Sequence, residues 1–142
     1  MKKLFFGLFS LTLLATACKK DKDAPAVEPT KENLAGTYKV TAIAITVAGV
    51  PGSYDGYNDL EACEKDDQYK LNLDNSFEYI DAGTACDPNG GYTGEWSLSD
   101  HEVTFGDVSG TITKFDGTTV EVTATTTEQE VTMTIKSTFK KL

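Results

Sequence analysis

The chain carries few residues that could perform acid–base or nucleophilic chemistry. Its only histidine, His101, lies in the segment Ser99-Asp100-His101-Glu102, which places a hydroxyl, a carboxylate and an imidazole close together in sequence. A Ser-His-Asp triad needs side chains that converge from separate elements, whereas neighbouring residues on one tight turn point away from each other. We therefore interpret His101 as a surface turn residue, predict no catalytic residues and expect that the protein is not an enzyme.

An acidic, glycine-containing segment is the second group with possible chemistry, because carboxylates supply the oxygen ligands that calcium prefers. Its acidic residues are Asp55, Asp59, Glu61, Glu64, Asp66 and Asp67. Their spacing does not fit an EF-hand loop, and the cysteines lack the Cys-x-x-Cys spacing of zinc sites and redox motifs. We interpret the segment as a solvated rim, with Asp66 and Asp67 turning the chain into the next strand. We therefore predict no metal and no cofactor.

The charge balance excludes one class of partner. The 142 residues include 22 acidic side chains against 13 basic ones, which gives a formal net charge of −9, and arginine is absent. Negative charge repels phosphate, and guanidinium groups are the usual bidentate readers of phosphate. We therefore expect no nucleic acid partner. The length allows one domain with a modest core, which we expect to be monomeric.

The N-terminal segment has the pattern of an export signal. Met1-Lys2-Lys3 precedes an apolar run from Leu4 to Leu14, and Ala15-Thr16-Ala17 stands directly before Cys18. This pattern resembles the processing site of bacterial lipoproteins, which implies a signal peptide over residues 1–17 and acylation of Cys18, for example with palmitate. One alternative is a transmembrane anchor, although the apolar run is shorter than the ~20 residues that span a bilayer. Conventional secretion is the other alternative.

Residues 18–33 are predicted to form a flexible tether. Charged residues and prolines dominate this stretch, which has almost nothing to bury. Lys19 directly after Cys18 agrees with lipoprotein sorting to the outer membrane. The cluster Lys19-Lys20-Asp21-Lys22-Asp23 resembles a signal for export to the cell surface, and an ordinary solubilising linker is an equal alternative. The resemblance implies a lipid anchor in the outer membrane, facing the periplasm or the cell surface.

Two further cysteines, Cys63 and Cys86, are the only ones beyond Cys18. Export places them in an oxidising compartment, so we predict that they form a disulfide. Closing this loop would constrain the unfolded chain by roughly 3 kcal/mol. Two free thiols or a redox pair are the alternative.

From residue 34 to residue 142 the sequence is typical of an all-β domain. Apolar and polar residues alternate, as in Val120, Val122 and Ala124 against Glu121 and Thr123. The last strand alternates in the same way, with Val131, Met133 and Ile135 on its apolar face. The pattern predicts eight strands, at Thr37–Ala48, Gln68–Leu73, Phe77–Asp81, Tyr92–Ser97, Glu102–Gly106, Gly110–Phe115, Thr118–Thr126 and Glu130–Phe139. Short turns favour a meander, and closing the meander removes its exposed edges. We therefore predict an eight-stranded up-and-down antiparallel β-barrel.

Two local features refine this prediction. A helical turn is expected over Lys31–Leu34, with Thr30 as its N-cap and Gly36 ending it. In the first strand the alternation shifts between Val40 and Ile43, which predicts a β-bulge or sharp bend.

The order of several motifs resembles the lipocalin-like domains of bacterial outer-membrane lipoproteins. Gly36-Thr37-Tyr38 is similar to the Gly-x-Trp signature of lipocalins, with tyrosine in place of tryptophan. The motifs that follow are Cys63-Glu64-Lys65-Asp66-Asp67, the turn from Asp74 to Phe77, Cys86, and Gly94-Glu95-Trp96. The resemblance covers Leu34 to Leu142 and implies a lipocalin-like barrel.

Aromatic residues on these strands are the candidate ligand-binding residues. They are Tyr38, Tyr69, Phe77, Tyr79, Tyr92, Trp96 and Phe105. The interior of an eight-stranded barrel is either filled by side chains or just wide enough for one small ligand, so the alternative, which these residues favour, is an ordinary core. Short strands and large aromatics favour a mostly filled barrel with a shallow cup at its mouth.

These observations lead to one functional prediction and one alternative. The prediction is a membrane-anchored lipoprotein whose barrel binds a small apolar or amphipathic ligand without catalysis. The alternative is a filled barrel that serves as a structural or interaction module. In that case loops around Tyr54, Tyr57 and Asp59 would contact a protein or a glycan.

Overall fold

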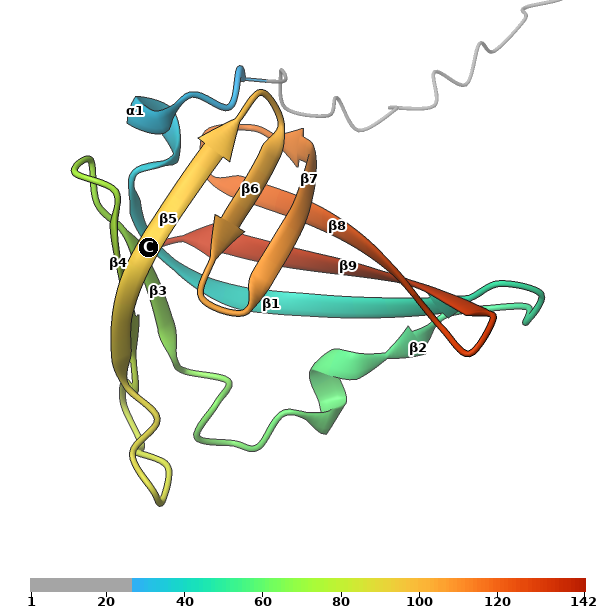
Figure 1. Ribbon diagram of the computed structural model, residues 1–142. Coiled ribbons are helices and arrows are strands. Elements are labelled where there is room, and N and C mark those ends of the chain that lie inside the picture. Colours follow the sequence, from blue (N-terminus) through green and yellow to red (C-terminus); the bar gives the residue numbers. More distant parts are fainter. Residues whose placement is uncertain (1–26) are drawn as a thin grey trace, which may run out of the picture.

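The computed structural model describes residues 27–142, so the predicted signal peptide and Cys18 lie outside the described residues (Figure 1). These residues form one short helix, one 3₁₀ turn and nine strands. Their bounds are α1 Lys31–Leu34, β1 Gly36–Val47, β2 Tyr54–Asp55, η1 Gly56–Asp59, β3 Gln68–Leu71, β4 Ser76–Ile80, β5 Tyr92–Ser99, β6 Glu102–Phe105, β7 Val108–Phe115, β8 Thr119–Glu128 and β9 Val131–Lys141. Among residues 27–142, no helix has the length and apolar character that crossing a membrane requires.

Eight of the strands form a closed antiparallel ring. Each strand from β3 to β8 pairs with the next one along the chain, and β1 pairs with both β3 and β9. This closure confirms the predicted all-β, eight-stranded meander. The ninth strand, β2, was not predicted; it is two residues long and pairs only with Ala44 and Ile45 of β1.

The strands β1, β8 and β9 run on beyond the ring as a three-stranded extension (Figure 1). The register of β1 against β9 shifts between Val40 and Ala42, which confirms the predicted bulge and bends the strand away from β3. At the far tip of this extension Val131 is exposed. Its alternation had placed it on the apolar face of the last strand, but at the tip no core remains to cover it.

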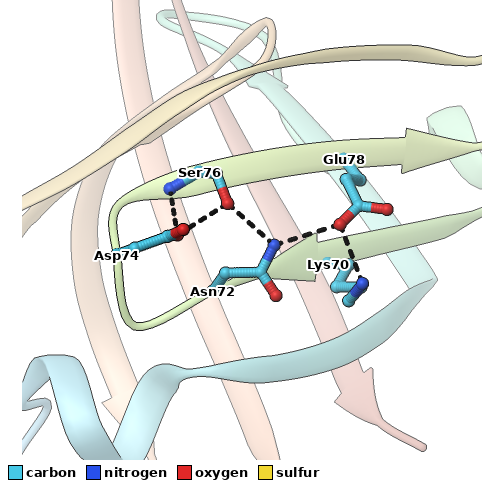
Figure 2. Close-up of polar contacts among 5 residues, drawn as sticks. All are labelled: Lys70, Asn72, Asp74, Ser76 and Glu78. Atoms are coloured by element: carbon cyan, nitrogen blue, oxygen red, sulfur yellow. Dashed lines mark hydrogen bonds and ion pairs between the residues drawn. The ribbon is translucent and has the colours of Figure 1, made fainter.

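The outer face of the β3–β4 hairpin is joined by a chain of polar contacts (Figure 2). Asp74 accepts hydrogen bonds from the backbone N–H and the hydroxyl of Ser76, which fixes the turn. The amide of Asn72 donates to Ser76 and to Glu78, and Glu78 also pairs with Lys70 at 2.8 Å. The ammonium of Lys70 and the Asn72 amide lower the pKa of Glu78, while Ser76 lowers that of Asp74.

The turn of this hairpin also corrects one predicted boundary. The strand expected to reach Leu73 ends at Leu71, and the Leu73 side chain is exposed. The reversal needs Asn75 in the left-handed region, with φ 73°, a conformation that asparagine adopts more readily than most residues. The chain must therefore leave the β3 ladder before Leu73.

One end of the barrel is closed by α1. Thr30 accepts a hydrogen bond from the Asn33 N–H and caps the turn, as predicted. Leu34 is then 1% exposed, and its carbonyl accepts a hydrogen bond from the Tyr38 hydroxyl at 2.7 Å. The carbonyl of Phe115 accepts from the Val27 N–H at the same end, where the described chain begins. Leu34 therefore plugs this end, and the opposite end is the barrel mouth.

Candidate ligand site at the barrel mouth

The interior of the barrel is filled by side chains. Its hydrophobic core leaves a cavity of about 10 Å³ between α1 and the strands, roughly enough for one water molecule. Four of the seven aromatic residues predicted to bind a ligand belong to this core, namely Tyr38, Phe77, Trp96 and Phe105. The indole N–H of Trp96 is satisfied by the carbonyl of Asn72 at 2.7 Å. These four residues hold the fold together, and a ligand could not enter between them without displacing the core.

The other three predicted residues lie at the mouth. Tyr69, Tyr79 and Tyr92 occupy paired positions on β3, β4 and β5, so their rings form a row across three strands. The ring centroids of Tyr69 and Tyr79 are 5.1 Å apart, and those of Tyr79 and Tyr92 are 5.3 Å apart. Tyr69 and Tyr79 are partly exposed and Tyr92 is 41% exposed. The row therefore rests on the core at one side and meets solvent at the other.

Burial and nearby carboxylates keep these phenols neutral. Burial is the main cause that raises the pKa of Tyr69 to about 12, and the charges of Asp67, Glu64 and Asp107 contribute. Burial also raises the pKa of Tyr79, as does its hydrogen bond to Asp67, and burial and Asp107 raise that of Tyr92. The row thus presents protonated, uncharged aromatic faces throughout the physiological pH range.

Asp67 is the buried polar residue that organises the mouth. It is 2% exposed, and it accepts hydrogen bonds from the Tyr79 hydroxyl at 2.5 Å and from the Ala82 N–H at 3.1 Å. The sequence prediction of a solvated rim is therefore wrong for Asp67. Because a buried carboxylate is costly unless it is hydrogen-bonded, these two donors fix the segment before β3 against the loop after β4.

The predicted disulfide joins the same two segments. Cys63 and Cys86 are bonded to each other, which confirms the predicted pairing. Asp66 accepts from the Thr84 N–H, and Asp81 accepts from the Cys86 and Gly90 N–H groups. The segment leading into β3 and the β4–β5 loop are thus held together by one covalent bond and several hydrogen bonds.

The calcium hypothesis for the acidic segment has one geometric candidate. Within the described residues, Asp67, Asp81 and Cys86 bring ligand atoms within 4.8 Å of one another. The sulfur of Cys86 is already bonded to Cys63, and both carboxylates accept the hydrogen bonds given above. Most carboxylates of the segment also act locally, as Asp55 does by accepting from the Tyr57 N–H. The group is therefore explained as a structural element of the two loops.

Two hollows open at the mouth. The first has a volume of about 130 Å³ and lies on the inner side of β7, β8 and β9; its lining is Asp107, Val108, Ser109, Val122, Ala124, Ile135 and Ser137. The second, of about 340 Å³, is shallow and lies over the ends of β4 and β5, with Tyr79, Tyr92, Asp81 and Asn89 in its lining. Sequence reasoning did not identify the first hollow. The signal for it was the small size of Ala124 and Ser137 at inward positions between bulky neighbours.

Tyr92 connects the two hollows. It lines the second one, while its hydroxyl reaches Gly106, whose neighbour Asp107 lines the first. Gly106 has φ 52°, and a Cβ atom built there would lie 2.5 Å from the Tyr92 hydroxyl oxygen. Only glycine therefore suits this turn, both for its backbone conformation and for the approach of the Tyr92 ring.

The segment η1 covers part of the mouth from the β1 side. Gly56 packs against Ile43 and Ile45, and Tyr57 and Leu60 contact the core from outside. Tyr54 remains 57% exposed, with its hydroxyl 2.6 Å from the Asp59 carboxylate. Of the three loop residues predicted to contact a partner, Tyr57 thus packs inward while Tyr54 and Asp59 bind each other at the surface.

His101 lies in the β5–β6 turn, at the closed end and far along the barrel from this mouth. Its side chain is exposed, and within residues 27–142 it makes no hydrogen bond to a serine or a carboxylate. The neighbouring Asp100 adopts φ 53° to reverse the chain. These observations place His101 on a surface turn.

The fold and the mouth can now be compared with known proteins. Residues 34–130 match the family described as a lipocalin-like domain, which covers more than half of the chain. The chain belongs to this family. No curated protein and no solved structure matches it significantly. Membership suggests that this lipocalin-like domain is a small-ligand-binding barrel, since the fold is in general a non-catalytic binding fold. The filled interior restricts where such a ligand can bind.

Proposed function

We propose that this lipocalin-like domain binds a small amphipathic molecule at its mouth, without catalysis, and that a lipid on Cys18 anchors it to the outer membrane. One observation carries the binding proposal: the interior is filled, whereas the mouth retains two hollows, one lined by Tyr92 and the other by Asp107. The first hollow suits an apolar group, because Val108, Val122 and Ile135 line it. Asp107, Ser109 and Ser137 supply polar atoms to the same lining, and an apolar hollow with a few polar groups is the usual composition of a ligand site.

The position at which the described chain begins supports the proposed lipid anchor. The described residues begin at Val27, which pairs with Phe115 at the closed end beside α1. A lipid on Cys18 would therefore attach the domain to the membrane through its closed end and leave the mouth facing away from the membrane. Two or three acyl chains are sufficient for stable attachment. Location in the outer membrane, on the periplasmic face or at the cell surface, is part of the proposal and rests on the sequence around Cys18.

Native mass spectrometry tests the binding proposal. The full chain carrying Cys18→Ser, which would be exported without acylation, is purified from its own host without detergent and compared with a denatured sample. We expect an excess mass that is lost on denaturation and that identifies the class of ligand. An unliganded mass, together with failure of small amphiphiles to shift the amide resonances of Tyr92 and Asp107, would refute binding at the mouth. In wild-type protein, incorporation of labelled palmitate that Cys18→Ser abolishes tests the anchor.

A second candidate function is an interaction module. Val50 and Tyr54, next to the β1–β2 turn, are 60% and 57% exposed, and both lie outside the mouth hollows. Exposed apolar and aromatic side chains on a loop suit contact with a protein or a glycan. The double variant Val50→Ser, Tyr54→Ser would abolish partner capture by the intact protein if this loop is the contact. Small-ligand binding at the mouth would then stay unchanged.

A further inference from the structure

The mouth has an unbalanced charge. Its three connecting segments, residues 48–67, 81–91 and 106–107, contain nine acidic side chains and one lysine, Lys65. The ammonium of Lys65 lies over the Tyr57 ring, 5.4 Å from the ring centroid. Other lysines gather near the closed end, where Lys141 donates to the Asn33 carbonyl. A ligand that approaches the mouth therefore meets a negative field with one basic side chain, which a tyrosine ring already contacts.

Asp107 is the carboxylate best placed to meet a ligand. It lines the 130 Å³ hollow on the β6–β7 turn, it is exposed, and its carboxylate makes no hydrogen bond within the described residues. The buried Asp67, by contrast, is already satisfied by Tyr79 and Ala82. The hydroxyl of Tyr92 reaches Gly106, the residue before Asp107, so this aromatic side chain lies close to the same turn. Aromatic rings attract cations.

We propose that the mouth selects a small organic cation, an ammonium group carried on one aromatic ring or short alkyl chain. This inference rests on the proposed binding function and adds the chemical class of the ligand. The 130 Å³ hollow is close to the roughly 150 Å³ that accommodates a benzene ring in a protein interior, so it suits one ring. The ammonium group would then lie at the edge of the hollow beside the Asp107 carboxylate, on the turn that the Tyr92 hydroxyl reaches.

The same arrangement disfavours the other common classes of small amphiphile. A fatty-acid carboxylate would face Asp107, Asp81 and Glu64 with Lys65 as the only basic group in the three segments. A neutral alcohol would gain the apolar contacts and lose the attraction to Asp107. The negative charge of the mouth therefore discriminates between these ligands by their head groups, while the shape of the hollow accommodates their apolar part.

A matched set of three ligands tests the inference. They are 2-phenylethylammonium, 2-phenylethanol and 3-phenylpropionate, which share one ring and differ in the charge of the head group. Binding to the full chain carrying Cys18→Ser is measured by calorimetry and by amide chemical shifts. We expect the ammonium ion to bind on the order of tenfold more tightly than the alcohol, and the carboxylate to bind most weakly. Added salt should weaken binding of the ammonium ion and leave the alcohol unaffected.

Two variants test whether the charge of Asp107, and not only the shape of the hollow, determines the affinity for the ligand. Asp107→Asn should reduce the affinity for the ammonium ion about fivefold without changing that for the alcohol. Asp100→Asn, on an exposed turn at the closed end, is the matched control and should change neither. Equal binding of ammonium, alcohol and carboxylate would overturn the cation inference and leave binding at the mouth standing. Failure of all three to shift the resonances of Tyr92, Asp107 and Ser109 would overturn the binding proposal itself.

Discussion

Replacing Phe77 with alanine should destabilise the domain and create a binding site inside it. The Phe77 side chain is fully buried, and its ring centroid lies 6.4 Å from Tyr69, 5.8 Å from Tyr92 and 5.9 Å from Phe105. Truncation loses the transfer free energy of the ring and three aromatic contacts, and leaves a cavity that these neighbours cannot fill. Phe→Ala changes in such cores cost about 3–5 kcal/mol, and we expect a value in that range.

Urea denaturation followed by Trp96 fluorescence measures the loss. Leu73→Ala, at an exposed turn position, is the control and should change the free energy of unfolding by under about 0.5 kcal/mol. Benzene at ten times its dissociation constant for the new cavity should then stabilise Phe77→Ala by about 1.4 kcal/mol more than it stabilises wild type, in which only the mouth hollow can take a ring. A cost below about 1 kcal/mol would show that Phe77 is not the centre of a packed core. Equal stabilisation of wild type and Phe77→Ala by benzene would show that the substitution opens no new site in the core.

Two further predictions concern pH and the disulfide. Burial raises the pKa of Tyr38 and Tyr69 from 10.0 to about 12, so the unfolded state loses these protons first. Stability should be complete below pH 10 and fall between about pH 10 and 12, by up to ~1.4 kcal/mol per pH unit for each tyrosine. Tyr69→Phe should reduce that slope in denaturation curves, and an unchanged slope would contradict the assignment. Replacing Cys63 and Cys86 with serine should cost roughly 3 kcal/mol. Hydrogen exchange should then accelerate most in residues 56–67 and 81–91, and less in β8 and β9, where only the loss of global stability acts. Equal acceleration throughout would refute a local role at the mouth.

The barrel was predictable from the sequence because alternation and turn chemistry agree along most of the chain. The inward and outward positions of β4, β6 and β8 follow directly from period-two patterns, and closure follows from the need to pair the last strand with the first. The two residues of β2 were not predictable, since no period is visible in two residues. The exposure of Val131 was missed because alternation reports which face a residue occupies and not whether a core lies opposite that face.

The candidate site was only partly predictable, again because alternation reports which face a residue occupies and not what surrounds it. Alternation placed seven aromatic residues inside the barrel, but their height along the barrel axis decides whether each one is core or mouth. Tyr92 lies at the open end and Trp96 is buried four residues further along the same strand. Asp67 was misjudged because its partners, Tyr79 and Ala82, lie 12 and 15 residues away in sequence. A buried carboxylate has no local pattern when its donors come from another loop.

The two ends of the barrel are built differently. At the closed end Leu34 fills the opening, and backbone pairing fixes the entering chain beside Phe115. At the mouth, loops long enough to leave hollows are instead fixed by a disulfide and by buried Asp67, which lowers the conformational entropy that a ligand would otherwise have to remove on binding. A domain whose interior is already packed can bind only where its loops leave space. Rigid loops at the end that faces away from the entering chain are therefore the feature that makes a binding function physically reasonable for this barrel.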